Sequence, residues 1–309
     1  MFYSLYQQVR QQPNLQHSLS LIRSVPFGKE APIFWLVVGL SFLNWGFEAK
    51  KWQLLVSTIQ SFSFLRAFKS VLSGITLSLN TPNRMGEYGG RIIYVETGNR
   101  IKAISLSIAG SISQLIITLL LGCMGLTYML FFQGAGEVTL MGLPDFWLRI
   151  LLYLSVIITL LLLLFFFRLS WLIRLVEKIP ASGKVVQYIS VLDHFDAKLL
   201  LRLLFLSFLR YIVFVLQYIL MLHVLQVAIP WMSAFWIITI LFLVLAIVPS
   251  FAIADLGIRG KFSVELLGFY SANTIGIIGT TFGIWMINLF IPALAGSLLI
   301  LNVKFFKDK

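Results

Sequence analysis

The sequence contains few charged residues for its length. Of its 309 residues, 12% are charged and 59% are hydrophobic, and the mean hydropathy is +0.92. A soluble domain normally has about 25% charged residues, so this chain has too little polar surface to cover a core that faces water. In a bilayer, lipid covers apolar surface instead. The composition therefore argues against an ordinary soluble enzyme and predicts a membrane protein.

Groups that hold metals and cofactors are also scarce. Cys123 is the single cysteine and lies in an apolar run, so the chain cannot form an internal disulfide. His194 lies beside acidic residues in a charged stretch, and His223 lies in an apolar run where a packed histidine is expected. No G-x-x-x-x-G-K-[ST] element for ATP is present. We therefore expect no cofactor and no metal.

The excess of positive charge, formally +12, lies between the apolar runs. Basic clusters beside membrane segments set topology and bind anionic headgroups, and no continuous basic stripe indicates nucleic acid. On the same grounds, we expect Glu48, Lys50 and Lys51 to anchor the end of the first helix among headgroups, with a role in a cavity as the alternative. The first thirty residues contain no continuous apolar segment, so a cleaved signal peptide is not expected.

Six apolar runs are long enough to cross a bilayer, which takes about 20 helical residues. They predict an all-α, polytopic membrane protein with about six full spans. The runs cover residues 31–47, 103–132, 146–167, 203–228, 231–249 and 274–302.

The sequence predicts a single membrane domain, 1–309, built from two halves. A basic segment, 1–30, precedes the first half, 31–167, and an amphipathic linker, 168–202, leads to the second half, 203–303. Positive charge in the linker predicts that it lies in the cytoplasm, and the loop between the second and third apolar runs fits the opposite side.

Each half contains an interruption in its apolar pattern, at 65–95 and at 249–270. Both combine proline, glycine and ionisable residues between short apolar pieces, and they predict re-entrant or broken helices. Irregular backbone at membrane depth is tolerated where it is buried in protein or lines a wet cavity. Paired interruptions are typical of an inverted repeat with a transport site at its interface.

The first interruption holds six candidate residues: Thr81, Pro82, Asn83, Arg84, Gly86 and Glu87. Proline and glycine break the helix here, and free N–H groups at the next helix would attract an anion such as a lipid phosphate. Arg84 would add a forked donor. In the alternative interpretation, Arg84 and Glu87 form an ordinary pair on a helix surface.

The second interruption contains Pro249, Asp255, Gly257 and Arg259. Ionisable residues so close to membrane helices usually face a bundle interior or an aqueous cavity. One helical turn would pair Asp255 with Arg259, although Gly257 and Gly260 argue against a regular helix here. A structural ion network at the membrane interface is the alternative. Elsewhere, Gly279 and Gly283 have GxxxG spacing, for which we expect internal packing, with an oligomer as the alternative.

Five segments together resemble the lysylphosphatidylglycerol synthase transmembrane-region family, whose members are described as flippase-like. They are residues 51–55, 80–87, 249–259, 287–288 and 291–296. The resemblance implies a membrane fold with re-entrant helices, related to the lipid-translocating part of multiple peptide resistance factor. No long hydrophilic segment in this sequence could form the separate synthase domain, so synthase activity is not expected of it. The family often has an acidic residue after its Gly-x-Arg element, where this chain has Gly260.

We therefore expect a multi-pass protein of the bacterial cytoplasmic membrane that moves a phosphate-bearing phospholipid or polyprenyl lipid between leaflets. Arg84 and Arg259 would attract phosphate, while Glu87 and Asp255 would orient these cations or receive a substrate amine. The alternative is a scaffold that presents lipid to a separate lipid-modifying enzyme without moving it. Catalysis by the chain itself is not expected, because no specific catalytic signature accompanies the carboxylates.

Overall fold

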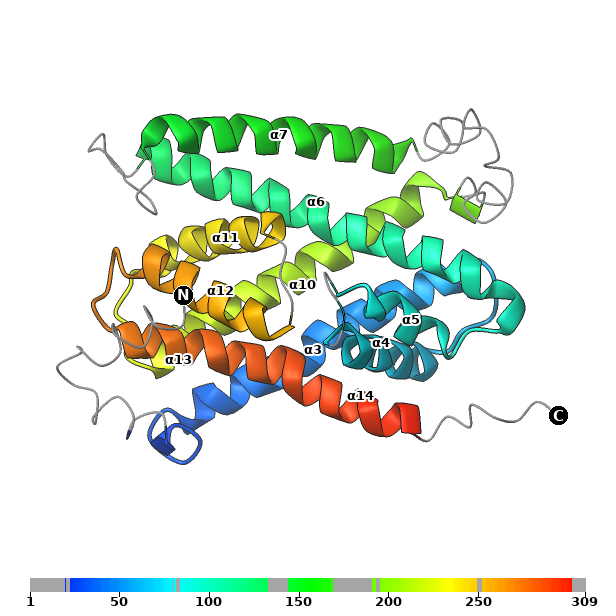
Figure 1. The fold of residues 1–309 in the computed structure, drawn as a ribbon, viewed down its shortest axis with the longest axis horizontal. Helices are drawn as coiled ribbons and strands as arrows, with labels where there is room; N and C mark the ends of the chain where they lie inside the picture. Colours follow the sequence, from blue (N-terminus) through cyan, green and yellow to red (C-terminus); the bar gives the residue numbers. More distant parts are fainter. Residues whose placement is uncertain are drawn as a thin grey trace. The chain divides into compact units, whose positions relative to one another are not determined.

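A computed structural model shows that the protein is helical (Figure 1). No strand occurs among the residues that the structure describes, so the predicted all-α class is confirmed. The described residues are 20, 23–79, 81, 84–132, 144–168, 191–192, 195–248 and 252–301.

Five continuous helical segments are long and apolar enough to cross a bilayer. The sixth predicted span is the shorter helix α11 (Trp231–Ile247), whose 17 residues extend about 25 Å, less than the hydrocarbon thickness of about 30 Å. The chain is therefore a multi-pass membrane protein. The five segments are α3 (Ala31–Val56), α6 (Arg100–Phe132), α7 (Asp145–Phe167), α10 (Ala197–Val224) and the run from α13 (Thr274–Trp285) to α14 (Ile291–Leu301).

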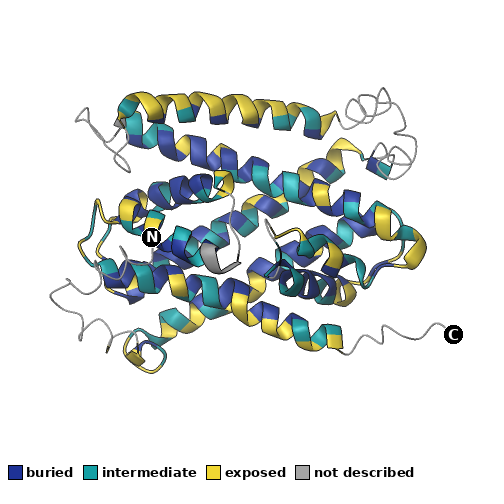
Figure 2. Ribbon diagram, in the orientation of Figure 1, coloured by how far each residue is buried: buried dark blue, intermediate teal, exposed yellow. Residues whose placement is uncertain are grey.

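Helix α7 shows how apolar the exposed surface is. Only 22% of its most apolar 18-residue stretch is buried inside the protein. Figure 2 shows exposed residues along the length of the helix. Large apolar side chains such as Trp147, Leu154 and Leu160 are more than half exposed. Lipid can cover such a surface where water cannot.

The chain divides into two compact units, each assembled from three segments. Unit 1 comprises Met1–Leu43, Thr118–Ile157 and Ile212–Asn288. Unit 2 comprises Asn44–Ile117, Ile158–Tyr211 and Leu289–Lys309. Each unit takes residues from both predicted halves of the sequence, and the inverted repeat itself stays a prediction.

The first interruption forms two short helices in unit 2, α4 (Phe64–Ser78) and α5 (Gly86–Ile92). Helix α4 begins where the Ser63 side chain accepts a hydrogen bond from the Arg66 backbone N–H at 3.3 Å, a normal helix cap. The two helices pack closely, because a Cβ on Gly90 would lie 2.4 Å from the Ser73 carbonyl oxygen. A short 3-10 turn, η2 (Thr97–Asn99), then leads into α6.

The second interruption lies in unit 1 and differs from the prediction. Helix α11 ends at Ile247, and α12 (Ala252–Leu267) runs continuously through Gly257 and Gly260. The expectation that these glycines prevent a regular helix is therefore wrong. Each glycine costs about 1 kcal/mol in a helix interior, and burial of both residues supplies packing that offsets this cost.

The helical run from α13 to α14 contains one irregular turn. Asn273 caps α13 by accepting a hydrogen bond from the Gly276 backbone N–H at 2.9 Å, and residues Met286–Phe290 form a π-helix, η4. Pro292 lies two residues beyond the end of η4, and it lacks the N–H that would bond the carbonyl four residues earlier. A π-turn beside a proline is a common way to accommodate that loss.

Several predicted features fall outside the described residues. These are Pro82, Asn83, Pro249 and most of the predicted segments 1–30 and 168–202.

Candidate functional site

Helix α3 continues nine residues beyond the predicted end of the first span, to Val56. This extension carries Glu48 and Lys51 into the protein, where they are 3% and 1% exposed. Lys50, between them, is exposed and donates a hydrogen bond to Gln53 at 2.9 Å. The prediction that all three charges anchor the helix among headgroups is therefore wrong for Glu48 and Lys51, because they belong to the buried face of α3.

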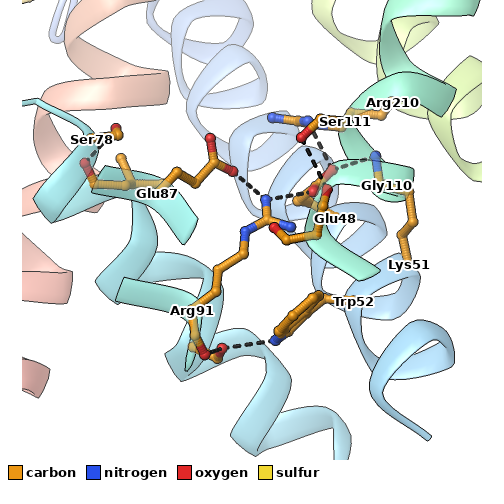
Figure 3. A network of polar contacts seen from close by, with 12 residues as sticks. Glu48, Lys51, Trp52, Ser78, Glu87, Arg91, Gly110, Ser111 and Arg210 are labelled. Atoms are coloured by element: carbon orange, nitrogen blue, oxygen red, sulfur yellow. Dashed lines mark hydrogen bonds and ion pairs between the residues drawn. The ribbon is translucent and has the colours of Figure 1, made fainter. Parts of the chain in front are cut away.

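Glu48 is the centre of a network of charged side chains in unit 2 (Figure 3). Its Oε2 atom accepts from Lys51 Nζ at 2.9 Å and from Arg210 Nη1 at 2.8 Å. Its Oε1 atom accepts from Arg91 Nη2 at 2.6 Å, and the same nitrogen also pairs with Glu87. We call these five residues the ion cluster. Helices α3, α5 and α10 contribute its members.

The ion cluster carries more positive than negative charge. Three cations meet two carboxylates, which leaves an excess of one positive charge when all are ionised. Glu87 is 25% exposed and Arg210 is 18% exposed, whereas Glu48, Lys51 and Arg91 are at most 3% exposed. Removing ions from water is costly unless they are paired, so a surplus charge at such depth favours binding of an anion.

Arg91 is held by its neighbours but not fully paired. Its guanidinium carbon lies 5.5 Å from the centre of the Trp52 ring, within range of a cation–π interaction. Trp52 Nε1 donates to Ser70 Oγ at 2.8 Å, and Ser70 Oγ donates to the Arg91 backbone carbonyl at 2.6 Å. Arg91 Nε and Nη1 are buried without a hydrogen-bond partner among the described residues. A buried donor left unpaired costs about 1–3 kcal/mol.

Arg210 and Lys51 have further polar partners in unit 2. Arg210 Nε donates to Asn44 Oδ1 at 2.7 Å, and its guanidinium carbon lies 4.8 Å from the centre of the Trp45 ring. Lys51 Nζ donates to Ser207 Oγ at 3.3 Å. These contacts fix both cations beside Glu48, so the cluster is a preorganised site.

The structure describes four of the six residues predicted from the first interruption, and these four lie in different surroundings. Thr81 accepts a hydrogen bond from the Gly86 backbone N–H at 2.7 Å, and a Cβ on Gly86 would lie 2.2 Å from the Leu77 carbonyl oxygen. Both residues therefore shape the connection into α5. Arg84 is exposed and has a positive φ of 58°, a conformation uncommon outside glycine. Glu87 joins the ion cluster through Arg91.

Of the residues predicted from the second interruption, Asp255, Gly257 and Arg259 lie on α12 in unit 1. Asp255 Oδ2 accepts from Arg259 Nε at 2.8 Å, and the two side chains are 6% and 18% exposed. Gly257 lies between them in the sequence and is buried. The predicted turn-spaced pair is therefore present. A site shared by the two interruptions stays a prediction.

Sequence reasoning missed four members of the ion cluster as site residues: Glu48, Lys51, Arg91 and Arg210. A usable signal was present, because Arg210 lies inside the predicted apolar span 203–228 and an arginine within a span requires a partner. Glu48, in the first apolar helix, was the matching carboxylate. Arg91 gave a weaker signal. It lies in a short amphipathic segment, whose sequence is as consistent with a surface position for Arg91 as with a buried one.

Comparison with known proteins identifies the family. The model of the family "Lysylphosphatidylglycerol synthase TM region" matches residues 14–296. The chain belongs to the lysylphosphatidylglycerol synthase transmembrane-region family. The match includes every member of the ion cluster and both predicted interruptions, and it indicates a membrane protein involved in lipid handling. No curated protein matches this chain.

The ion cluster offers this member of the lysylphosphatidylglycerol synthase transmembrane-region family a means of electrostatic recognition. No group of three or more His, Cys, Asp or Glu side chains that could hold a metal ion occurs in the described part of the chain. The ion cluster can attract and orient an anionic group through fixed cations. It is therefore the best-formed candidate for recognition of a lipid headgroup.

Proposed function

We propose that this protein moves a phosphate-bearing phospholipid or polyprenyl lipid between the leaflets of the bacterial cytoplasmic membrane. The observation that carries the proposal is the ion cluster, in which three cations and two carboxylates meet inside an apolar, membrane-spanning fold. Ionisable residues inside membrane segments are expensive, and they usually mark the path of a substrate or ion. Family membership supports lipid as the substrate.

The headgroup would bind at the cations while the acyl chains remain in the surrounding lipid. Arg91 and Arg210 offer guanidinium groups suited to phosphate, and the short helices α4 and α5 bring Arg91 to Glu48. Arg84 and the Asp255–Arg259 pair are further headgroup contacts in this proposal. Glu87 and Asp255 would orient the cations or receive a substrate amine.

We further propose that the chain itself catalyses no covalent reaction. Its partners would be membrane lipids with anionic or phosphate headgroups, and a separate enzyme would carry out any chemistry on them. A scaffold that presents lipid to such an enzyme is the competing function. It would bind the same headgroup without moving it, so transport by the isolated protein separates the two.

The test is lipid translocation in proteoliposomes, using a panel of anionic, aminoacylated and polyprenyl phosphate lipids. Arg84→Ala and Asp255→Asn are compared with the intact protein, and Asp145→Asn is the control because the Asp145–Arg149 pair is about half exposed and 3.9 Å apart. We expect transport of one lipid class by the intact protein and the control, and reduced transport by both test variants. Binding without transport across the panel would favour the scaffold.

A further inference from the structure

We propose that the ion cluster binds one phosphate monoanion together with one proton, and that Lys51 carries the proton. This inference deepens the proposed function, on which it rests, by naming the group of the lipid that is recognised and the ion that accompanies it. It is carried by two observations in unit 2: the unpaired donors of Arg91 and the charge balance of the cluster.

Arg91 supplies the anion-binding donors. Its side chain is 2% exposed, and its Nη2 atom is taken by both Glu48 and Glu87. Its Nε and Nη1 atoms are buried without a partner among the described residues. A phosphate monoanion offers several oxygens that suit such donors and brings a negative charge, which a water molecule lacks. Contact with the Trp52 ring helps to hold the guanidinium in place.

The charge balance then requires a proton. With all five groups ionised, the cluster has one surplus positive charge, and a bound monoanion makes it neutral. Without the anion, the cluster becomes neutral only when one cation releases a proton. Arginine does not do so in proteins, whereas a buried lysine can. Anion binding would therefore be accompanied by protonation of the Lys51 amine.

The surroundings of Lys51 suit both protonation states. On its own helix, Glu48 Oε2 lies 2.9 Å from Nζ. From α10, Arg210 binds the same carboxylate oxygen, and Ser207 Oγ lies 3.3 Å from Nζ. From α5, Arg91 binds the other oxygen of Glu48 and pairs with Glu87. From α6, the Gly110 backbone lies beside the Lys51 stem. A neutral amine can still donate to Glu48 and accept from the Ser207 hydroxyl.

Measurements on the wild-type protein test whether binding of the anion is accompanied by uptake of a proton. The full chain, purified in a phosphate-free glycosidic detergent, is titrated calorimetrically with dimethyl phosphate, whose single charge does not change near neutral pH. Buffers of different ionisation enthalpy give the number of protons taken up. We expect uptake to rise towards one proton per anion as the pH increases, with Kd rising towards about tenfold per pH unit. Binding with no uptake across the pH range, or no binding, would overturn the inference.

Variants assign the proton to a residue. In Lys51→Arg the positive charge is permanent, so binding should persist without proton uptake. Lys50→Met is the matched control, because Lys50 is the exposed neighbour on the same helix, and it should take up protons as the wild type does. Proton uptake that persists in Lys51→Arg would overturn the assignment. If arginine does not fit the buried position, Lys51→Met should bind more weakly with no pH dependence, and retained pH dependence would contradict the inference.

Two further ligands distinguish the source of the phosphate group. Binding of short-chain phosphatidylglycerol and dimethyl phosphate in preference to inorganic phosphate identifies a lipid headgroup, whereas the reverse preference identifies free phosphate. These outcomes separate this inference from the transport proposal. Binding with proton uptake but no translocation supports the inference and contradicts transport. Translocation without proton uptake contradicts only the inference.

Discussion

At the residue scale, Glu48 determines whether the ion cluster can exist. Its carboxylate accepts from Lys51, Arg91 and Arg210, all within 2.9 Å. Removing one partner from a buried ion network leaves uncompensated charges, whereas replacing a whole pair with apolar groups can be neutral. The side chain is thus a structural requirement for any binding by the three cations.

Glu48→Gln should therefore lower the free energy of unfolding by about 3–5 kcal/mol, because two buried cations, Lys51 and Arg91, and the partly buried Arg210 lose their shared counter-charge. Unfolding in mixed detergent micelles measures the change. Glu265→Gln is the control, since the Lys261–Glu265 pair is 3.7 Å apart and half to one-third exposed, and it should change stability by about 0–1 kcal/mol. Equal effects in the two variants would contradict the account of the cluster.

The hydrogen bond of the Trp52 indole gives a second prediction at this scale. Trp52→Phe keeps an aromatic ring near Arg91 but removes the donor to Ser70, so stability should fall by about 1–3 kcal/mol. Trp35→Phe is the matched control, because Trp35 is 55% exposed and its Nε1 donates to the Pro26 carbonyl at 3.2 Å. Its effect should stay within about 0.5 kcal/mol, as measured by thermal unfolding. A smaller effect at Trp52 than at Trp35 would show that the buried bond is not important.

Sequence reasoning succeeded at individual residues where the relevant contacts are local. The spacing of Asp255 and Arg259 predicted their pairing because both residues lie on one helical turn. The partners of Glu48 could not be predicted in the same way, because Arg91 and Arg210 are 43 and 162 residues away. Only the packing of α5 and α10 against α3 brings these charges together.

At the element scale, unit 2 depends on close contact between short helices. Thr76 Oγ1 on α4 donates to the Ala293 carbonyl on α14 at 2.8 Å. A Cβ on Gly296 would lie 2.2 Å from the Leu72 carbonyl oxygen. Small residues at such contacts allow helix backbones to approach closely in membranes, and here they position α4, against which α5 and Arg91 are placed.

Gly296→Ala should destabilise the protein by about 1–3 kcal/mol, because the added methyl group forces α14 away from α4. Gly46→Ala is the matched control within unit 2, since a Cβ there meets no atom within 4 Å. That substitution should stabilise α3 by about 0.5–1 kcal/mol. The comparison is made by thermal unfolding in detergent, and a neutral Gly296→Ala would contradict the proposed helix contact.

The existence of the helices was predictable, but their ends were less so. Long apolar runs give a strong signal for membrane spans, and the first interruption was evident from its glycines and ionisable residues. The extension of α3 to Val56 was not predicted, because Glu48, Lys50 and Lys51 resemble the charged end of a span. Whether a charge ends a helix or lies within it depends on partners far away in the sequence.

At the scale of the whole molecule, the distribution of charge predicts the topology. The linker 168–202 is expected in the cytoplasm and the loop between α6 and α7 on the opposite side. After Cys123→Ser, single cysteines at positions 184 and 137 should react with membrane-impermeant reagents from opposite sides. Labelling of both positions from one side would contradict the topology, because α7 must cross the membrane between them.

The central claim is that the ion cluster recognises the headgroup of a lipid that the protein moves. The most direct measurement is the translocation rate of fluorescent phosphatidylglycerol in proteoliposomes containing the wild type, Arg91→Lys or Lys50→Met. Arg91→Lys retains the charge but loses the forked donors, so translocation should slow by at least about tenfold, while Lys50→Met should match the wild type. Unchanged translocation by a folded Arg91→Lys protein would contradict the claim.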